Sequence, residues 1–196
     1  EQDNPDVLPK VTLEDVPFDI SEPKPTEIAL SKSGIAHTFF GQPTNGLAYQ
    51  QIIIELPEVP GELLEILPLY TTCLPEFGVG QRDYEAVQTW QSQISGGVNC
   101  FSSTRSGLDN EQESKSFVSL SSKALVKNHS ELSKLLYQTL TELRLDESER
   151  LTDLIEQMCA RKENSITAQG HSLAMSLASS GFSPTAKLIH EFNGLE

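Results

Sequence analysis

Histidine, serine and cysteine are among the side chains of this sequence whose types suit catalysis or metal binding. The four histidines are His37, His129, His171 and His190. No two of them stand four residues apart, the spacing that puts two metal ligands on adjacent turns of one helix. We therefore expect no metal site built from this chain alone, and we interpret the histidines as surface or hydrogen-bonded side chains.

Residues 170–174, with the sequence GHSLA, partly match the G-x-S-x-G turn that presents the nucleophile of serine hydrolases. That turn follows a buried strand, whereas residues 163–169 are polar and typical of a helix. The last glycine of the motif is replaced by Ala174. We favour a helix on which Gly170 and Ala174 allow close packing, and we keep an independent hydrolase using Ser172 as an alternative.

The three cysteines are an odd number and too scattered for a disulfide framework. Cys73, Cys100 and Cys159 lie far apart and form no C-x-x-C pair. Each has apolar neighbours, and Cys159 falls on an apolar helical stripe with Leu154 and Met158. We interpret all three as buried small apolar side chains rather than nucleophiles, in a protein of a reducing compartment.

A strand and a helix are predicted over residues 44–77. The turn signal at 44–46 precedes a run rich in isoleucine that predicts a strand ending at Pro57. A Pro-Gly pair at 60–61 then opens a helix with apolar residues at intervals of three and four, and two prolines inside it predict a kink or a break. The stripe expected on one face is Leu63, Ile66, Leu67, Tyr70, Leu74 and Phe77, and the two prolines are Pro68 and Pro75.

After residue 82 the pattern predicts one helix, two strands and then four helices. Strands early and helices late indicate a two-layer α+β fold, in which helices cover one face of a mostly antiparallel sheet. The predicted elements are a helix capped by Asp83 and ending near Gly96-Gly97, strands at 98–104 and 117–122, a helix from Ser130 with leucines at 132, 135, 136, 140 and 143 on one face, a helix capped by Asp146 with Glu149, a helix over 166–180, and a short one from Ser183-Pro184.

Residues 1–26 have the composition of an acidic, proline-rich linker. Five of the 11 prolines lie within the first 25 residues, too dense for a helix or a central strand. Residues 1–27 hold eight acidic and two basic side chains, hence −6 of the −14 of the whole chain. We divide the chain into a linker over 1–26 and one module over 27–196, and the charge argues against a nucleic-acid or anionic-membrane partner. No run approaches the ~18 apolar residues of a membrane span, and no secretory signal is apparent.

Residues 44–68 have the sequence TNGLAYQQIIIELPEVPGELLEILP. This strand, turn and long apolar helix resemble the pitrilysin or insulinase family of zinc metallopeptidases, most closely the third module of its presequence-protease branch. The resemblance implies a metallopeptidase-like α+β module. Further matching pieces, in the same order between residues 35 and 195, are 74–78, 83–84, 94–99, 121–125 and Gly170-His171 with Ala174.

In active modules of that family the corresponding helix carries H-x-x-E-H, where two histidines bind zinc and the glutamate is the general base. Alignment on Pro60-Gly61 puts residues 64–68, LEILP, at those five places. The nearest histidines are His37 and His129. The resemblance therefore implies a non-catalytic module without a cofactor of its own, with zinc in the first module of the parent enzyme.

The segment Gly96-Gly97-Val98-Asn99, followed by Phe101, matches a second feature of the active modules. There it leads into an edge strand that pairs with an extended substrate. We expect these residues either to contact peptide along an edge strand or to form an inherited turn and strand with a structural role alone, and we favour the structural interpretation.

The resemblance implies a fragment of a presequence-protease-like enzyme that degrades short unstructured peptides, basic ones among them. This module would form part of the wall of a closed chamber together with other modules of the same polypeptide. The implied compartment is the bacterial cytoplasm or, in a eukaryote, the mitochondrial or plastid matrix. A stand-alone, non-catalytic interaction or regulatory protein with the same fold is the alternative. Leu195-Glu196 is either native sequence or the remnant of an expression tag.

Overall fold

The computed structural model describes residues 11–16, 18–19, 22–32 and 34–194. Contacts between residues divide the chain into two compact units, Glu1–Thr44 and Asn45–Glu196. Leu195-Glu196, whose origin the sequence left open, lies outside the described residues.

The described part of the first unit contains one turn of 3-10 helix and a β-hairpin. The turn η2 is Leu13–Asp15, and the antiparallel strands are β1 (Glu27–Leu30) and β2 (Ala36–Phe39). Residues 1–10, 17, 20 and 21 of the predicted linker lie outside the described residues. The division into a linker over 1–26 and a module over 27–196 stays a prediction.

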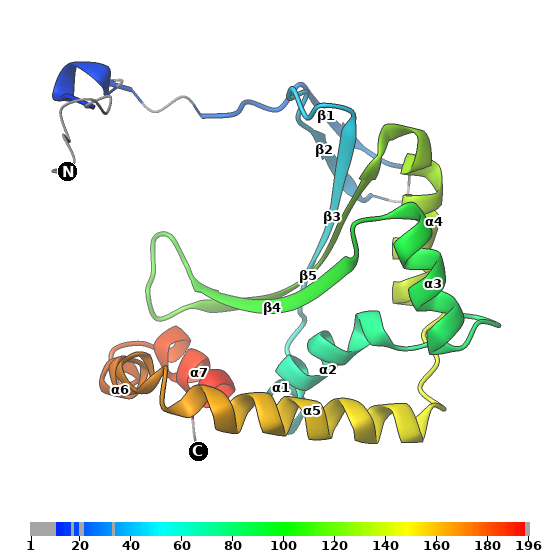
Figure 1. The fold of residues 1–196 in the computed structure, drawn as a ribbon. Coiled ribbons are helices and arrows are strands. Elements are labelled where there is room, and N and C mark those ends of the chain that lie inside the picture. Colours follow the sequence, from blue (N-terminus) through cyan, green and yellow to red (C-terminus); the bar gives the residue numbers. More distant parts are fainter. Residues whose placement is uncertain (1–10, 17, 20–21, 33, 195–196) are drawn as a thin grey trace, which may run out of the picture. The chain divides into compact units, whose positions relative to one another are not determined.

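The second unit is built on a three-stranded antiparallel sheet (Figure 1). Strands β3 (Leu47–Glu55), β4 (Val98–Ser106) and β5 (Ser114–Leu125) lie in the order β3-β5-β4. Both β4 and β5 coincide with predicted strands and are longer than predicted. The antiparallel sheet and its helices confirm the predicted α+β class.

A left-handed turn leads into β3. Asn45 and Gly46 have φ angles of 52° and 80°. Glycine adopts this conformation without steric cost, and asparagine tolerates it better than most residues. The turn predicted at residues 44–46 is therefore confirmed, and it sets where the isoleucine-rich strand begins.

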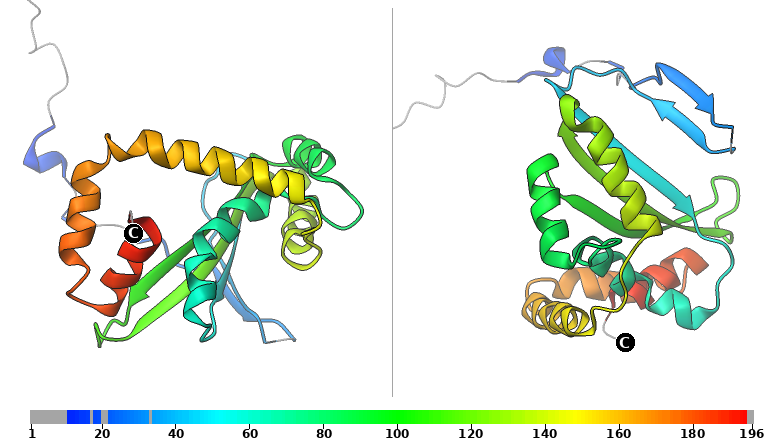
Figure 2. Two further views of the ribbon diagram at one scale, coloured as in Figure 1. Left: turned by 90° about the horizontal axis from the view of Figure 1, so that it is seen from below. Right: turned by 90° about the vertical axis from the view of Figure 1, so that its right-hand side faces the viewer.

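Helix α4 (His129–Thr141) supplies much of the core and lies along the covered face of the sheet, as the right-hand view of Figure 2 shows. Leu132, Leu135 and Leu136 are at most 1% exposed, and they pack with Leu120 at the centre of β5. Side chains alternate along a strand, so the even-numbered residues of β5 point towards the helices. The predicted leucine stripe is confirmed at these three positions.

The helix predicted from residue 61 is broken near both prolines. Helix α1 (Gly61–Glu65) stops before α2 (Leu67–Cys73), Pro68 lies in the first turn of α2, and Pro75 lies in the 3-10 turn η3 (Leu74–Glu76). This confirms the predicted break, because proline has no N–H to donate to the preceding turn. The prediction of one apolar stripe is wrong, because the break turns part of it away from the core. Leu67, Leu74 and Phe77 are buried, whereas Leu63, Ile66 and Tyr70 are 52%, 51% and 43% exposed.

Side-chain caps fix the starts of α3 (Tyr84–Ile94) and α7 (Pro184–Asn193). The carboxylate of Asp83 accepts the N–H of Ala86 at 2.9 Å, and the hydroxyl of Ser183 accepts the N–H of Ala186 at 3.1 Å. Each cap satisfies a backbone donor that has no partner within its helix. Both predicted starts are confirmed.

Two other predicted helix starts are wrong. Helix α5 is Ser148–Ile166, and the Asp146 carboxylate does not cap it, because the Arg144 guanidinium holds that carboxylate through hydrogen bonds of 2.9 and 3.1 Å. The helix expected from Ile166 begins later, as α6 (Gly170–Ser179), since the polar residues before it continue α5. Helices α6 and α7 pack against each other beyond the end of α5 (Figure 2, left).

Candidate functional site

The five places aligned with H-x-x-E-H cross the break between α1 and α2. Leu64 and Glu65 end α1, Ile66 joins the two helices, and Leu67 and Pro68 begin α2. Two histidine ligands one turn apart need an unbroken helix. Only Glu65 offers a metal-binding side chain, so these residues do not fit a zinc ion either by type or by backbone.

Gly96 and Gly97 form the turn that joins α3 to β4. Gly97 has a φ of 92°, in the left-handed region that favours glycine. The N–H of Gly96 donates to the carbonyl of Lys123 at 2.8 Å, and the hydroxyl of Ser122 donates to the carbonyl of Gly97 at 2.8 Å. These bonds tie the turn to β5 and set the register in which β4 begins.

The structure places the other predicted site residues on opposite faces of β4. Val98 is 9% exposed and belongs to the core. Asn99 and Phe101 lie on the other face, where Phe101 is 46% exposed. Strand β4 is an edge strand of its three-stranded sheet. The five residues thus form a turn and the first half of an edge strand, and their contact with peptide stays a prediction.

The free edge of β4 carries main-chain groups that point away from β5. The N–H of Gly107 donates to the carbonyl of Glu113 at 2.9 Å, next to the last ladder pair. Hydrogen-bonded and non-hydrogen-bonded pairs alternate along an antiparallel ladder. Odd-numbered residues of β4 therefore bond to β5, whereas even-numbered ones turn their N–H and C=O groups to the free edge.

A hollow of about 240 Å³ lies beside this edge. Its walls come from three elements that are distant in sequence, so no local pattern marked it. Its lining includes Ser102, Ser103 and Thr104 of β4, Pro68 of α2, and Ile189 and Phe192 of α7. The hollow combines hydroxyl groups and an apolar wall with the main-chain groups of an edge strand, which suits an extended peptide better than a small polar ligand.

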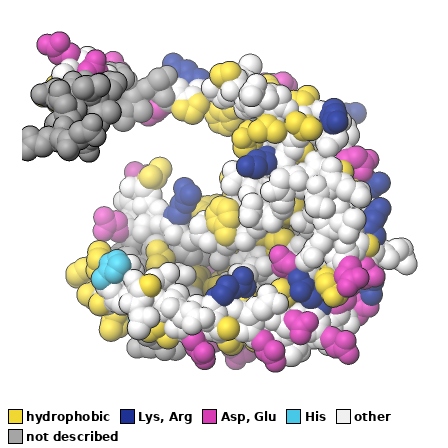
Figure 3. Space-filling view, viewed as in Figure 1, with side chains coloured by type: hydrophobic (Ala, Val, Ile, Leu, Met, Phe, Trp, Pro, Cys, Tyr) yellow, Lys and Arg dark blue, Asp and Glu magenta, His cyan; other side chains and the backbone are white. Residues whose placement is uncertain are grey.

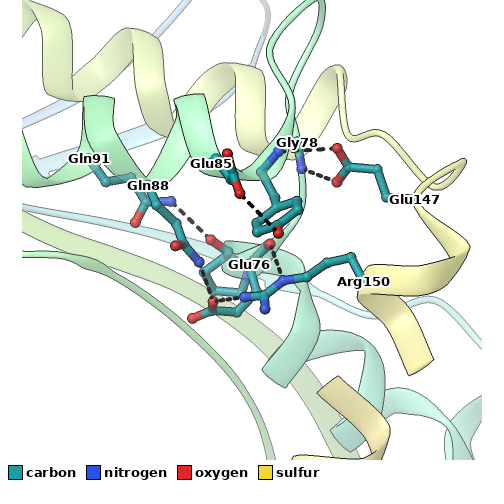
Figure 4. Close-up of polar contacts among 9 residues, drawn as sticks. Glu76, Gly78, Glu85, Gln88, Gln91, Glu147 and Arg150 are labelled. Carbon is teal, nitrogen blue, oxygen red and sulfur yellow. Dashed lines mark hydrogen bonds and ion pairs between the residues drawn. The ribbon is translucent and has the colours of Figure 1, made fainter. Parts of the chain in front are cut away.

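A carboxylate from the start of α5 holds the segment between η3 and α3 (Figure 4). Glu147 accepts the N–H of Gly78 at 2.7 Å and the N–H of Tyr84 at 3.1 Å. Gly78 permits this approach, because a Cβ there would lie 2.5 Å from the carbonyl of Arg82 and 2.7 Å from Glu147 Oε1. One side chain thus satisfies two donors of a segment more than 60 residues away.

Arg150 strengthens the same attachment one turn further along α5 (Figure 4). Its Nη2 lies 2.7 Å from the carboxylate of Glu76, and its guanidinium carbon lies 4.6 Å from the ring centroid of Tyr84. Sequence reasoning missed both Glu147 and Arg150, because nothing in the local pattern marks partners so far apart along the chain.

Ser172 lies in the first turn of α6 and is exposed. The residues before it belong to helix α5 and a turn, so the strand that a nucleophile elbow needs does not precede it. This finding argues against the serine hydrolase alternative. The close packing predicted at Gly170 is also wrong, because a Cβ there would meet no atom within 4 Å.

The histidines are not gathered into a site. His129 and His171 are exposed in the first turns of α4 and α6, and His37 is exposed on β2. His190 on α7 is buried, with Nδ1 3.5 Å from the hydroxyl of Ser176. Across the described ranges, no group of three or more His, Cys, Asp or Glu side chains is arranged to hold a metal ion. Within the same ranges, no helix has the length and apolar character needed to cross a membrane.

The cysteines differ in burial more than the sequence predicted. Cys73 is buried, Cys100 is half-buried and Cys159 is exposed. Burial of Cys159 is therefore a wrong prediction, because among the residues of α5 only Leu154 is buried. Burial raises the pKa of Cys73, and it raises the pKa of Cys100 to about 11. Cys159 is therefore the thiol that a reagent in solution reaches most easily.

We expect iodoacetamide at about pH 8 to modify Cys159 well before the other two thiols. With a pKa of about 11, only about one Cys100 thiol in a thousand is ionised at that pH, and the thiolate is the reactive form. Raising the pH to about 10 therefore increases the alkylation rate of Cys100 roughly a hundredfold, as mass spectrometry of timed digests would measure. Equal labelling of all three thiols in the folded protein would contradict this order.

Comparisons with known proteins show the family to which this sequence is similar. The family model that matches residues 1–196 describes a domain associated with the M-16 peptidases, subfamily C. The chain is 28% identical over 195 residues to "Presequence protease, mitochondrial" of Yarrowia lipolytica, 27% over 200 residues to the protein of that name in Candida albicans, and 26% over 163 residues to that in Danio rerio. The matches cover 100%, 100% and 83% of this chain but only 19%, 19% and 16% of those relatives.

Proposed function

The chain belongs to this peptidase-associated family, and from this premise we propose that it is the non-catalytic third module of a presequence-protease-like zinc metallopeptidase. The observation that carries the proposal is at residues 64–68. A peptidase-associated family matches the whole length of the chain. At the place where an active module has H-x-x-E-H on one helix, this chain has the sequence LEILP and a break between two helices. Another module must then carry the zinc and the general base.

The proposed role is that of a wall. Together with other modules of the same polypeptide, the chain encloses a chamber that admits short unstructured peptides, basic ones among them, and excludes folded proteins. The small share of each relative that the chain matches, 16% to 19% in the three above, supports a place within a longer enzyme. Relatives named as mitochondrial, and one named as chloroplastic/mitochondrial, support the mitochondrial or plastid matrix if the source is a eukaryote. For a bacterial source the proposed compartment is the cytoplasm.

The free edge of β4 is the proposed place for peptide contact within this wall. Its even-numbered residues turn donors and acceptors outward next to the hollow of about 240 Å³. An extended peptide added to this edge would extend the ladder that begins at Gly96, Gly97 and Val98, with Asn99 and Phe101 alongside.

The test uses the gene and its product. We expect the reading frame upstream of Glu1 to encode an in-frame H-x-x-E-H several hundred codons earlier. The full product should cleave a short fluorogenic peptide and lose this activity with a chelator, while the 196-residue chain alone shows none. Chelator-sensitive cleavage by the 196-residue chain would overturn the non-catalytic assignment, and an initiator codon just before Glu1 would favour the stand-alone interaction protein.

A further inference from the structure

The β3-β5-β4 sheet has a second face, made by the odd-numbered residues of its strands. Core residues Leu120, Val98 and Ala124 occupy even positions and meet the helices. On the odd-numbered face, Ile53 is 61% exposed and Phe101 is 46% exposed. No helix of residues 45–194 buries these two apolar side chains, so a binding partner could contact them.

Two serines of β5 lie along the centre of this odd-numbered face. Ser119 of β5 stands directly between Ile53 of β3 and Phe101 of β4, and it is only 5% exposed. In the next row, Ser121 stands between Gln51 and Asn99. The larger neighbours cover Ser119, so a ligand on this face would contact the exposed side chains of Ile53 and Phe101 rather than the serine.

The odd-numbered face is basic, although the chain as a whole has a net charge of −14. Its charged residues are Lys123, Lys115 and Arg105 against the single acid Glu55, a net charge of +2. Glu55 is already paired with Lys115 at 2.8 Å. Acidic side chains gather elsewhere, notably over α5 (Figure 3). Charges more than about 8–10 Å away are largely screened at physiological salt, so a ligand above Lys123 meets the charge of that lysine rather than the acidic side chains of α5.

Lys123 is the cation best placed to meet a ligand. Its stem lies over Gly96, where a Cβ would come within 2.9 Å of Cε and 3.1 Å of Cγ. It pairs across the strands with Tyr49, which is 63% exposed. The row of Ile53, Ser119 and Phe101 lies four residues from Lys123 along β5. At 3.3 Å per residue this is a distance of about 13 Å.

We propose that this face binds an extended acidic peptide, with a carboxylate over Lys123 and an apolar side chain, four peptide residues away, against the exposed surfaces of Ile53 and Phe101. In an extended peptide, residues i and i+4 point to the same side, which matches the 13 Å spacing given above. The amides of Gln51 and Asn99 lie between the two subsites and face the peptide backbone. The inference rests on the proposed function and goes beyond it, because it adds to the edge of β4 a second peptide site, on the face of the sheet, that selects acidic peptides.

Binding by the 196-residue chain tests the proposal without requiring catalysis. The probe is a fluorescein-labelled peptide of nine residues, with glutamate at its third position, phenylalanine at its seventh, and serine and threonine elsewhere. We expect saturable anisotropy that weakens as salt rises. A peptide with lysine in place of the glutamate, or with the two residues adjacent, should bind at least about fivefold more weakly.

Matched variants locate the binding. Lys123→Glu should weaken binding of the glutamate peptide about tenfold and strengthen binding of the lysine peptide, whereas Lys134→Glu on exposed α4 should change neither. Phe101→Ser should weaken binding about fivefold, and Tyr137→Ser, at a position 62% exposed on α4, should not. Unchanged circular dichroism shows that each variant is folded, and the reversed preference of Lys123→Glu cannot arise from unfolding.

Two results would overturn the proposal: equal affinity for the glutamate and lysine peptides, or an unchanged affinity in Lys123→Glu. If either result is found and the full gene product still shows chelator-sensitive cleavage, only the proposal of an acidic-peptide site is rejected. If the acidic peptide binds specifically but the full gene product shows no such cleavage, the proposal that the chain is part of a peptidase is rejected instead.

Discussion

Replacement of Leu120 by alanine is expected to lower the free energy of unfolding by about 3 kcal/mol, the cost of a large cavity in a closely packed core. Leu120 has 0% of its surface exposed and lies at the centre of β5, between Ile52 and Cys100 in the neighbouring strands. Leu132 and Leu136 of α4 belong to the same cluster, so the cavity would lie where the helix meets the sheet. Urea unfolding followed by the fluorescence of the single tryptophan, which packs against this core, measures the loss.

Leu125→Ala is the matched control, because it makes the same change on the same strand. Leu125 is 49% exposed and lies on the odd-numbered face of the sheet. We expect its replacement to cost less than about 1 kcal/mol. Equal losses at the two positions would show that the even-numbered face of β5 is not the one that the helices bury.

The features that the sequence predicted correctly depend on residues close together along the chain. Asn45 and Gly46 supply the left-handed turn before β3, and Asp83 and Ser183 accept N–H groups three residues ahead of them. The leucine spacing of α4 likewise reports a face of one helix. In each case the physical cause acts within four residues, so the local pattern is sufficient.

The wrong predictions arose where a distant or competing partner decides the outcome. The capping role expected of Asp146 fails because Arg144 takes its carboxylate. Burial expected for Cys159 fails because the middle of α5 is largely exposed, a property that its own periodicity does not reveal. The hairpin of β1 and β2 was not predicted at all, and its residues are exposed.

The candidate site also has features that the sequence could predict and features that it could not. The sequence identified Gly96 and Gly97 as a turn before an edge strand, because glycine pairs mark turns locally. It could not identify the hollow beside β4, whose walls come from three separate elements. Nor could it identify the row of Ile53, Ser119 and Phe101, because Ser119 lies 66 residues from Ile53 and 18 from Phe101, and the strand register alone brings the three together.

Glu147 is the side chain whose loss is expected to do most damage outside the apolar core. Its carboxylate accepts the N–H groups of Gly78 and Tyr84, and it is half-buried. Glu147→Ala leaves both donors without this acceptor, at an expected cost of about 2–3 kcal/mol. Glu147→Gln keeps one acceptor oxygen but turns an NH₂ group towards the other donor, so we expect a loss of about half that size.

Hydrogen exchange distinguishes loss of this attachment from a general loss of stability. In Glu147→Ala the amides of Gly78 and Tyr84 should exchange faster than the rest of the core, because their acceptor is gone. Glu149→Ala, two residues along and exposed, is the control and should change stability by no more than about 0.5 kcal/mol. Destabilisation of Glu147→Ala with unchanged relative exchange at those two amides would mean that the carboxylate does not hold the segment. The expected result would instead show that the Glu147 carboxylate holds the chain between η3 and α3, although it lies 69 residues from Gly78 and 63 from Tyr84 in sequence.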